Sequence, residues 1–401
     1  MAQARPDHAP AYLDHAATTP MRPEAVAALA AEAARTGNPS SVHGAGRAAR
    51  RVVEEARELV ADRLGAHPTE VVFTSGGTEA DNLAITGLRG PSGGGMRRVL
   101  VSAVEHHAVL DPARALAGRP GQDVVWLPVD DVGRVRLAAL AQALDDEPGR
   151  DALVSVMWAN NEVGTVQPVA DVVALARTRG ALVHSDAVQA VGRLPVDFAA
   201  SGLDAMTVSA HKVGGPVGVG ALLVRRGVRV EPQLLGGGQE RGMRSGTVPA
   251  ALLRSFAVAV DLATAERAAE AVRVAGLRGE LVAGVLREVP DAVVRGPWPV
   301  TTAGDLQRLP SNAHLTFPGC DSEALLFGLD QAGVAASAGS ACQAGVQRAS
   351  HVLAAMGVPE IEARGAVRFS FGWTSTGADV EAVLGVIGEV VARARAAARA
   401  G

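Results

Sequence analysis

The segment Ala205-Met-Thr-Val-Ser-Ala-His-Lys-Val-Gly-Gly-Pro-Val-Gly-Val-Gly220 joins a short apolar run to a glycine-rich turn, and it contains Lys212. Lys212 is the only lysine of the chain, because every other residue among the 38 lysines and arginines is arginine. Arginine stays protonated and cannot form an imine, whereas a lysine amine can be deprotonated and used as a nucleophile. One alternative is a surface lysine retained by chance, but the strand end and the glycine-rich turn favour a functional amine.

Outward from this segment, short β-branched runs alternate with helical stretches from about residue 70 to residue 227. This alternation is typical of an α/β fold with a mostly parallel sheet and helices on both faces. Seven strands are predicted, at Glu70–Thr74, Arg98–Val104, Asp123–Pro128, Ala152–Ala159, Ala181–Asp186, Ala205–Ser209 and Gly218–Arg225. Three helices are predicted between them, at Glu79–Leu88, Leu137–Leu144 and Val169–Arg179. Ligands of such sheets bind at the carboxyl ends of the strands.

The pattern changes after the glycine-rich stretch Leu234–Gly246, where a long alanine-rich helix is predicted from about Val248 to Val289. A smaller α+β unit follows this helix. Its predicted elements are a strand at Ala313–Phe317, a helix at Asp321–Ala332, a strand at Ala366–Phe371 and a terminal helix at Asp379–Ala400. We therefore expect a large α/β domain over residues 15–257 and a small α+β domain over residues 1–14 and 258–401.

The composition excludes several classes of function. The 401 residues are 48% hydrophobic, which is enough for two or three globular units. With a formal net charge of −4, no direct nucleic-acid binding is expected. The charged, proline-containing N-terminus and the lack of a long apolar run predict a soluble, cytoplasmic protein without membrane association. Two cysteines, Cys320 and Cys342, are too few for a disulfide framework or a four-thiolate zinc site.

A candidate phosphate site lies in Phe73-Thr-Ser-Gly-Gly-Thr-Glu79, which combines a strand end, a glycine turn and a helix start. Backbone amides at such a turn, with the hydroxyls of Ser75 or Thr78, can bind an anion. The same residues are equally compatible with an ordinary turn in which Thr78 caps the helix.

Further polar groups follow other predicted strands. Asp186 could keep a pyridine nitrogen protonated, as in pyridoxal phosphate enzymes, or cap a helix. Asn160-Asn-Glu162 could bind ring or substrate oxygens, or form a turn. The histidines of Val104-Glu-His-His-Ala108 could stack on a planar cofactor and transfer protons, or be structural. Because these groups and Lys212 converge on one edge of the sheet, together they predict a cofactor site.

A second cluster surrounds Cys342 in Val334-Ala-Ala-Ser-Ala-Gly-Ser-Ala-Cys-Gln-Ala-Gly345. Side chains this small pack poorly, so we expect a mobile loop over about residues 334–348 that carries a reactive thiol; the alternative is an incidental small residue. Cys320 is expected to be incidental. Arg368 alternates with apolar residues on a strand, where it could bind a substrate carboxylate or form a structural ion pair.

Two other patterns carry less weight. The segment Gly44-Ala-Gly-Arg-Ala-Ala49 fits a dinucleotide-binding pattern, but no apolar strand precedes it. The pairs His314 with Cys320, and Cys342 with His351, lack the spacing of a zinc site, so no metal site is predicted.

Taken together, the motifs resemble those of the NifS/IscS-type cysteine desulfurases, in the class V aminotransferase branch of fold-type I pyridoxal phosphate enzymes. The resemblance covers nearly the whole chain. It is carried by Tyr12-Leu-Asp-His-Ala-Ala-Thr-Thr19, Gly37-Asn-Pro-Ser-Ser-Val-His-Gly44, Thr74-Ser-Gly-Gly-Thr-Glu79, Glu105-His106, Asn160-Asn-Glu162, Asp186-Ala-Val-Gln189, Ser209-Ala-His-Lys212, Arg241-Gly-Met-Arg-Ser-Gly-Thr247, Gly339-Ser-Ala-Cys342 and Arg368-Phe-Ser370. The chain departs from the family pattern at His15, where many relatives have asparagine, and at Gln343-Ala-Gly-Val-Gln-Arg-Ala-Ser350.

The resemblance implies a fold-type I transferase fold, a homodimer and a role for each matching residue. The implied residues are Lys212 for the Schiff base, His106 for stacking on the ring, Asp186 for the pyridine nitrogen, Gln189 for the phenolic oxygen, Gly77, Thr78, Ser209, His211 and the partner subunit's Thr247 for the phosphate, Asn161 for cofactor and substrate, Arg368 and Asn38 for the substrate, and Cys342 for sulfur transfer.

The implied reaction removes sulfur from L-cysteine and leaves L-alanine and a persulfide on Cys342. The sulfur acceptor would be a protein such as an iron–sulfur scaffold or a tRNA-thiolation enzyme. Three alternatives stay open: a class V aminotransferase or selenocysteine lyase without a role for Cys342, a nicotinamide-dependent dehydrogenase using Gly44–Ala49, and a sulfur-delivery scaffold recognised mainly by its partners.

Overall fold

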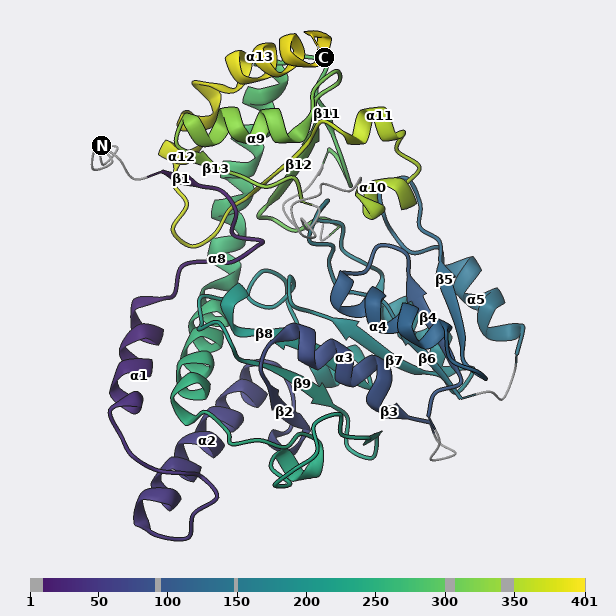
Figure 1. Cartoon of the computed structure of the whole chain (residues 1–401), viewed down its shortest axis with the longest axis vertical. Coiled ribbons are helices and arrows are strands. Elements are labelled where there is room, and N and C mark those ends of the chain that lie inside the picture. The colour runs from purple at the N-terminus through teal and green to yellow at the C-terminus, as the bar shows by residue number, and fades with distance from the viewer. Residues whose placement is uncertain (1–9, 91–94, 148–150, 300–306, 340–349, 401) are drawn as a thin grey trace.

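A seven-stranded sheet forms the centre of the molecule in the computed structural model, which describes residues 10–90, 95–147, 151–299, 307–339 and 350–400 (Figure 1). Its strand order is β2-β9-β8-β7-β6-β4-β5. The strands are β2 (Val71–Thr74), β4 (Arg98–Ser102), β5 (Asp123–Leu127), β6 (Ala152–Ser155), β7 (Leu182–Asp186), β8 (Ala205–Ser209) and β9 (Gly220–Val224). Only β9 runs antiparallel to its neighbours in this sheet, so the predicted mostly parallel sheet is confirmed.

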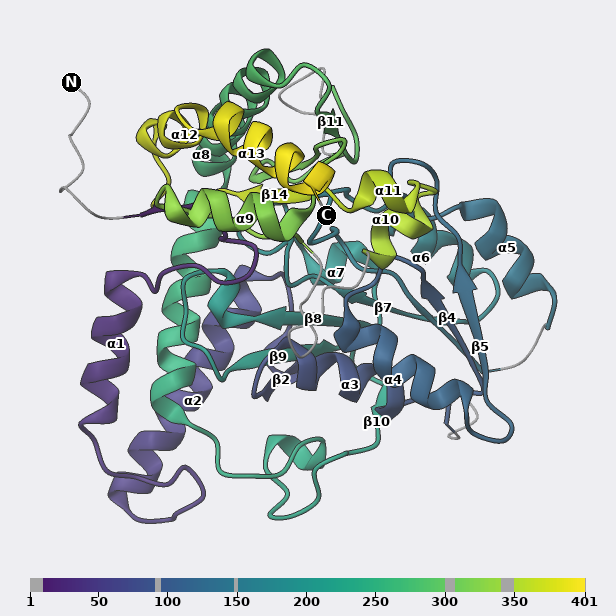
Figure 2. The same cartoon turned by 45° about the horizontal axis from the view of Figure 1, so that its top comes forward.

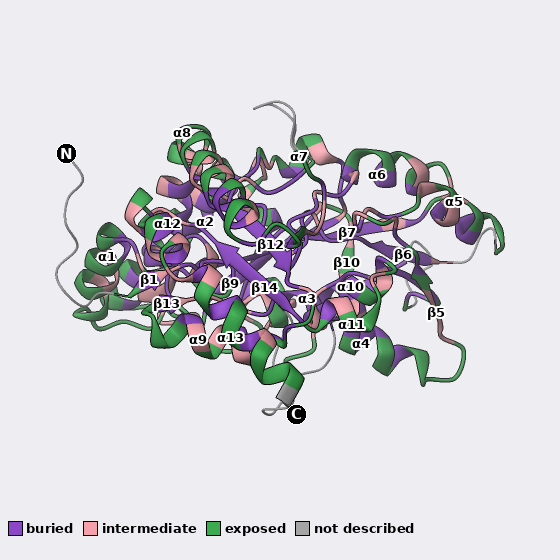
Figure 3. Cartoon of the chain, turned by 90° about the horizontal axis from the view of Figure 1, so that it is seen from above, coloured by how far each residue is buried: buried purple, intermediate pink, exposed green. Residues whose placement is uncertain are grey.

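Each face of this sheet packs against its own layer of helices, and the strands between them are buried except for the edge strand β5 (Figure 3). Because side chains alternate along a strand, Val71 and Phe73 join one apolar core while Val72 joins the other. The first face is covered by α2 (Gly44–Arg63), α5 (Leu137–Asp145), α6 (Val169–Arg177), α7 (Phe198–Ser201) and part of α8 (Ala250–Glu288), with α1 (Pro23–Ala33) contributing at its margin. The second face is covered by α3 (Gly77–Gly87) and α4 (His107–Ala117).

A further apolar core surrounds a three-stranded antiparallel sheet in the order β11-β12-β14. Figure 2 shows this unit, in green to yellow, above the large sheet. Its elements are β11 (Val293–Val294), β12 (Asn312–Thr316), α9 (Ser322–Gln331), β14 (Ala366–Ser370), α12 (Gly377–Leu384) and α13 (Ile387–Ala400). The N-terminal strand β1 (Ala11–Tyr12) joins it by pairing in parallel with β13 (Val334–Ala335).

Helix α8 connects the two units. It has 39 residues and is therefore about 60 Å long at 1.5 Å per residue. Its buried apolar side chains up to Ala263 belong to the core of the large sheet, and those from Val274 onward belong to the core of the small sheet. The domain boundary expected between residues 257 and 258 falls within this helix, and the division into domains stays a prediction.

The prediction of one terminal helix over Asp379–Ala400 is wrong, because α12 ends at Leu384 and α13 begins at Ile387. Gly385 lies at the break, and glycine is about 1 kcal/mol less favourable than alanine inside a helix. The break lets Val383 of α12 and Ile387 of α13 both enter the small core.

The remaining elements are short. They are β3 (Leu88–Arg89) paired with β10 (Arg229–Val230), α10 (His351–Ala355), α11 (Glu360–Ala363), and 3-10 turns at Pro68–Glu70, Ala210–Lys212 and Glu240–Gly242. Across the described ranges, none of the helices combines the length and the apolar character needed to cross a membrane.

A buried ion pair that the sequence did not reveal ties α2 to the glycine-rich stretch. Arg57 donates to both carboxylate oxygens of Glu240, at 2.8 and 2.7 Å. Glu240 also accepts a hydrogen bond from the backbone N–H of Phe73, at 2.8 Å. The two side chains are only 6% and 2% exposed.

Glu240→Ala is expected to lower the free energy of unfolding by about 3 kcal/mol or more, because the buried Arg57 guanidinium loses its buried counter-ion and keeps only the exposed carboxylate of Glu54. Denaturant unfolding measures this change. Glu389→Ala is the control, since Glu389 pairs with Arg393 at the surface and its loss should cost at most about 1 kcal/mol. Equal losses in the two variants would contradict the prediction.

Candidate active site

A cavity of about 420 Å³, called the main cavity below because most of the predicted site residues line it, opens at the carboxyl ends of β7 and β8. Its wall also includes residues of the small unit, such as Ser337 and Arg368. Ten of the predicted site residues line it: Gly77, Thr78, His106, Asn161, Asp186, Gln189, Ser209, His211, Lys212 and Arg368. Parallel strands present their carboxyl ends at one sheet edge, which explains why residues distant in sequence meet there.

Lys212 lies in the 3-10 turn that follows β8, and its amine is held by the N-terminal segment. The Nζ atom donates to the carbonyl oxygens of Ala16 and Ala17, both at 2.6 Å. Burial, followed by the positive charges of Arg368 and Arg193, lowers the pKa of Lys212 from 10.5 to about 7. A substantial fraction of the amine is therefore unprotonated at neutral pH, as a nucleophile requires.

Asp186 is the last residue of β7, and it is 5% exposed. Burial raises the pKa of Asp186 to about 6, while a hydrogen bond from the Val188 N–H at 2.8 Å and the nearby Lys212 charge favour the carboxylate. The carboxyl group faces the same cavity as Lys212. It can therefore hold a proton on a ring nitrogen that enters the cavity.

His106 and Gln189 also line the cavity. His106 caps α4, because its Nδ1 accepts from the Ala108 N–H at 3.1 Å. Burial lowers the pKa of His106 to about 4, so the ring is neutral at pH 7 and can stack on a planar group. Gln189 donates from Nε2 to the Ala16 carbonyl, the same oxygen that accepts from Lys212.

The N-terminus of α3 forms the predicted anion cradle. No side chain caps this helix, so Thr78 is not the cap that the alternative interpretation required. Gly76 has a φ of +153°, which glycine adopts readily, and a Cβ on Gly77 would come within 3.1 Å of Val188. The first N–H groups of α3 are thus available to an anion. The positive end of the helix dipole, which lies at this N-terminus, favours an anion there. Ser209 and His211 line the cavity as well.

Arg368 on β14 forms a structural ion pair, which is one of the two roles that its sequence position left open, and its role in substrate binding stays a prediction. Its Nη2 donates to Asp14 at 2.7 Å, which is an ion pair, and its Nη1 donates to the Asn161 carbonyl at 3.0 Å. Its Nε has no hydrogen-bond partner among the described residues, although the residue is 4% exposed. The guanidinium is thus held at the wall of the cavity by Asp14 and Asn161.

Two of the predicted residues that the structure describes, Asn38 and Thr247, do not line this cavity. Asn38 accepts from the Ser40 N–H outside it, and Thr247 lies at a different cavity, together with Gly37 and Pro39. Cys342 lies outside the described residues, while Gly339 and His351 on either side of that segment line the main cavity. Cys320 is buried in the small core, and burial raises the pKa of its thiol, as expected of an incidental cysteine.

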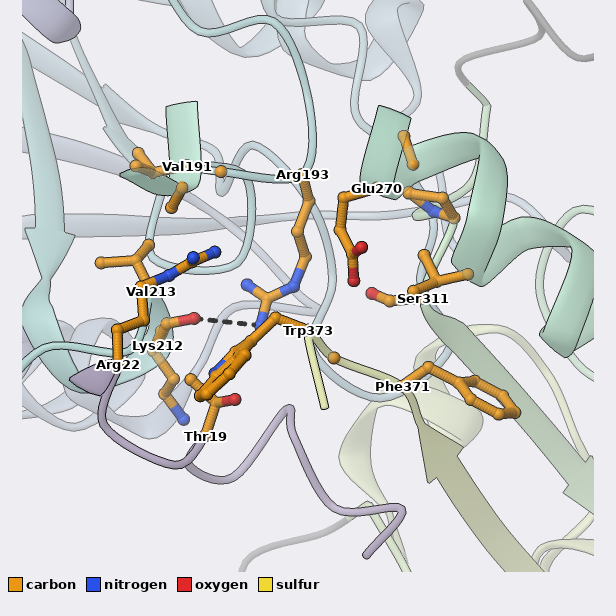
Figure 4. Close-up of a pocket in the computed structure, with 16 residues that line it drawn as sticks. Thr19, Arg22, Val191, Arg193, Lys212, Val213, Glu270, Ser311, Phe371 and Trp373 are labelled. Carbon is orange, nitrogen blue, oxygen red and sulfur yellow. Dashed lines mark hydrogen bonds between the residues drawn. The ribbon is translucent and has the colours of Figure 1, made fainter. Parts of the chain in front are cut away.

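Arg193 is a residue of the site that sequence reasoning missed. Figure 4 shows its guanidinium directed at the Lys212 carbonyl, to which Nη2 donates at 3.2 Å. It lines a small cavity of about 50 Å³ on another side of Lys212. One arginine among many carries no signal by itself, although its position four residues after Gln189 places it at the same sheet edge.

The dinucleotide pattern does not form a nucleotide site. Helix α2 begins at Gly44 with His43 as its cap, and residues 34–43 before it contain no strand. The beginning of α2 does not line the main cavity.

A half-buried lysine amine and a buried carboxyl group thus share one cavity at the edge of a doubly wound α/β sheet. The sequence matches the aminotransferase class-V family over residues 11–383. It is 52% identical to an IscS-like cysteine desulfurase of Mycobacterium tuberculosis, over 97% of this chain and 98% of that protein. It is 39% identical to the cysteine desulfurase IscS of Dictyoglomus turgidum, over 96% and 95% of the two chains. The solved structure of a NifS-like protein from Rickettsia africae aligns with a TM-score of 0.81 at 30% identity, covering 94% of this chain and 98% of that one.

The chain belongs to the aminotransferase class-V family and, within it, to the cysteine desulfurases. The α/β fold of the class V aminotransferases, which the motifs predicted, is thereby confirmed.

Proposed function

We propose that the chain uses pyridoxal phosphate to remove sulfur from L-cysteine, and that it forms L-alanine and a persulfide on Cys342. The observation that carries this proposal is the position of Lys212. The only lysine of a desulfurase-family chain lies in the main cavity with Asp186, and its pKa is lowered to about 7.

The residues of the cavity fit this cofactor. The uncapped N-terminus of α3, with Thr78, Ser209 and His211, offers donors for a phosphate. His106 offers a neutral ring for stacking, and Asp186 offers a carboxyl group for the pyridine nitrogen. The cavity of about 420 Å³ is in the range of small-molecule sites.

When bound, the cofactor supplies an electron-accepting ring that stabilises negative charge at the substrate Cα. Asp186 keeps the ring nitrogen protonated. The Lys212 amine removes the Cα proton and later returns a proton, which is general base and acid catalysis by one group. Arg368 binds the substrate carboxylate, supported by Asn161, because both residues line the cavity that contains Lys212.

Cys342 carries the sulfur transfer. Its thiolate attacks the sulfur of the substrate, so that an S–S bond forms and the Cβ–S bond breaks. The electron pair of the broken bond stays with Cβ, which takes up a proton and becomes the methyl group of alanine. No external oxidant is needed, because the substrate carbon is reduced as the two sulfurs become a persulfide.

The partner subunit's Thr247 contributes to the phosphate site in a homodimer. This part of the proposal is supported by apolar side chains without cover in the single chain, since Val42 and Leu235 are 85% and 84% exposed. The persulfide is passed to a sulfur-acceptor protein in the cytoplasm, either an iron–sulfur scaffold or a tRNA-thiolation enzyme.

Parallel assays test the function. Purified protein with pyridoxal phosphate and L-cysteine is expected to release alanine and, with a thiol reductant, sulfide in equal amounts. Transfer of the amino group to a keto acid without sulfide release would instead identify an aminotransferase. Activity with selenocysteine alone would identify a selenocysteine lyase.

The pH dependence of cofactor capture tests the environment of Lys212. Only an unprotonated amine attacks an aldehyde, so the rate at which the cofactor-free protein binds added pyridoxal phosphate should rise with pH and level off above about pH 7. Arg193→Met should move the midpoint upward, because it removes a positive charge that lowers the pKa of Lys212. Stopped-flow absorbance measures both rates, and a wild-type midpoint near pH 10 would contradict the prediction.

A further inference from the structure

Three buried carboxyl groups lie near one another at the cavity, and two of them, Asp81 and Asp186, line it. Asp81, Asp186 and Glu105 are 1%, 5% and 0% exposed. In the part of the chain that the structure describes, none of them forms an ion pair with an arginine, and Lys212 is the only amine nearby. Ionised carboxylates that share one buried region repel each other, so the group cannot be fully ionised at neutral pH.

Asp81 is the member for which no cationic partner is present. It lies on α3, one turn after Gly77, and lines the main cavity. Its Oδ1 is 3.5 Å from Nε2 of His184 and accepts no hydrogen bond from any described residue. A carboxylate oxygen left without a donor in this setting is costly, whereas a protonated carboxyl group carries no charge.

His184 does not balance a charge on Asp81. It lies two residues before Asp186 on β7, hence on the same face of the sheet. Its Nε2 is 3.0 Å from the Thr207 hydroxyl and its Nδ1 is 2.9 Å from the Ser155 hydroxyl. Burial lowers the pKa of His184 to about 3, so its ring is neutral at pH 7.

The surroundings of Asp81 favour its protonated form more strongly than those of Asp186 do. Burial is the largest cause that raises the pKa of Asp81 well above its usual value, and the negative charges of Asp186 and Glu105 raise it further. A hydrogen bond with Thr207 lowers it in part. Asp186 has the Val188 N–H and the Lys212 charge to stabilise its carboxylate. Glu105 has the backbone N–H of Met157 on one oxygen, and burial raises its pKa as well.

We propose that Asp81 is an uncharged carboxylic acid at neutral pH and acts as a positioning residue that leaves the buried negative charge to Asp186. This inference rests on the proposed function, in which Asp186 holds the proton of the cofactor's ring nitrogen. An ionised Asp81 would favour a protonated Asp186, and a protonated Asp186 would no longer be the anion that the ring nitrogen needs. Helix α3, whose N-terminus would hold the phosphate, would thereby also influence the charge beside the ring nitrogen.

Infrared difference spectroscopy of the purified full chain tests the protonation directly. A protonated carboxyl group and a carboxylate absorb at different frequencies. We expect Asp81→Asn to remove a carboxylic-acid band at pH 7, both without and with added pyridoxal phosphate. Glu105→Gln is the matched control, because it removes a different buried acid whose pKa is also raised, and it should leave the band that Asp81→Asn removes in place. Loss of a carboxylate band in the Asp81 variant would overturn the proposal, as would the absence of any carboxylic-acid band in the wild-type protein.

The cofactor-loaded protein gives a second measurement. Asparagine is a neutral isostere of protonated aspartate, so Asp81→Asn should leave the pH midpoint of the visible cofactor absorbance unchanged. A shift of about one pH unit or more, equivalent to about 1.4 kcal/mol, would mean that Asp81 carries a charge, and the proposal would fail. Failure of the wild-type chain to bind the cofactor would count against the proposed function instead, because the infrared test of Asp81 needs no cofactor.

Discussion

Replacement of Lys212 by alanine is expected to lower turnover of L-cysteine by about 10³-fold or more and to remove the yellow colour of the bound cofactor. The variant loses both the group that binds the aldehyde covalently and the base that moves the Cα proton, and general acid–base catalysis alone contributes about 10²–10⁴-fold. No other lysine of the chain can substitute, because Lys212 is the only one.

The uniqueness of this lysine allows a direct chemical test. Borohydride reduction of the cofactor-loaded protein should add one pyridoxyl phosphate group to the peptide that contains Lys212, as measured by mass spectrometry. Lys212→Arg is the matched control, since it keeps a positive charge on a long side chain but cannot form an imine. Turnover in either variant, or a reduced adduct on another residue, would refute the assignment of Lys212.

Replacement of Cys342 by serine is expected to leave the cofactor colour intact and to reduce release of sulfide and alanine by about 10²-fold or more. A hydroxyl group is a much weaker nucleophile toward sulfur than a thiolate, and no persulfide can form on it. Mass spectrometry after treatment with L-cysteine should find an additional sulfur atom on the peptide that contains Cys342 in the wild-type protein and none in the variant.

The second cysteine of the chain is the internal control for this experiment. Cys320 is buried in the small core, and burial raises the pKa of its thiol, so the reactive thiolate is disfavoured. Cys320→Ala should therefore retain turnover and the persulfide on Cys342. Normal sulfide release by the Cys342 variant, or loss of turnover in the Cys320 variant alone, would move the role of nucleophile away from Cys342.

Much of the fold could be predicted because its signals are local. The seven apolar runs became the seven strands of the large sheet, and in all of them except the edge strand β5 the run is buried on both faces, where continuous apolar side chains are needed. The antiparallel direction of β9 was not predicted, because direction depends on the length and path of the connection after Lys212. The break at Gly385 was missed because one glycine inside an otherwise helical pattern does not by itself end a helix.

The sequence predicted those site residues that directly follow a strand. It did not predict the residues of other segments that contact them. Arg193 and Asp81 have no distinctive spacing, and both matter only through their position next to Lys212 and Asp186. The carbonyl oxygens of Ala16 and Ala17, which hold the Lys212 amine, carry no side-chain signal at all. Asn38 and Thr247 matched the family motif, yet they do not line the main cavity of the single chain.

From its residues alone the chain specified an α/β architecture, a single candidate imine-forming amine and a family of relatives, because periodicity, residue chemistry and motif order are properties of the linear chain. Tertiary packing decided the protonation of that amine and of the acids around it. The pKa values of Lys212, Asp186 and Asp81 are set by burial and by charges that arrive from other parts of the chain, such as Arg193 and Arg368, and such distances exist only after folding.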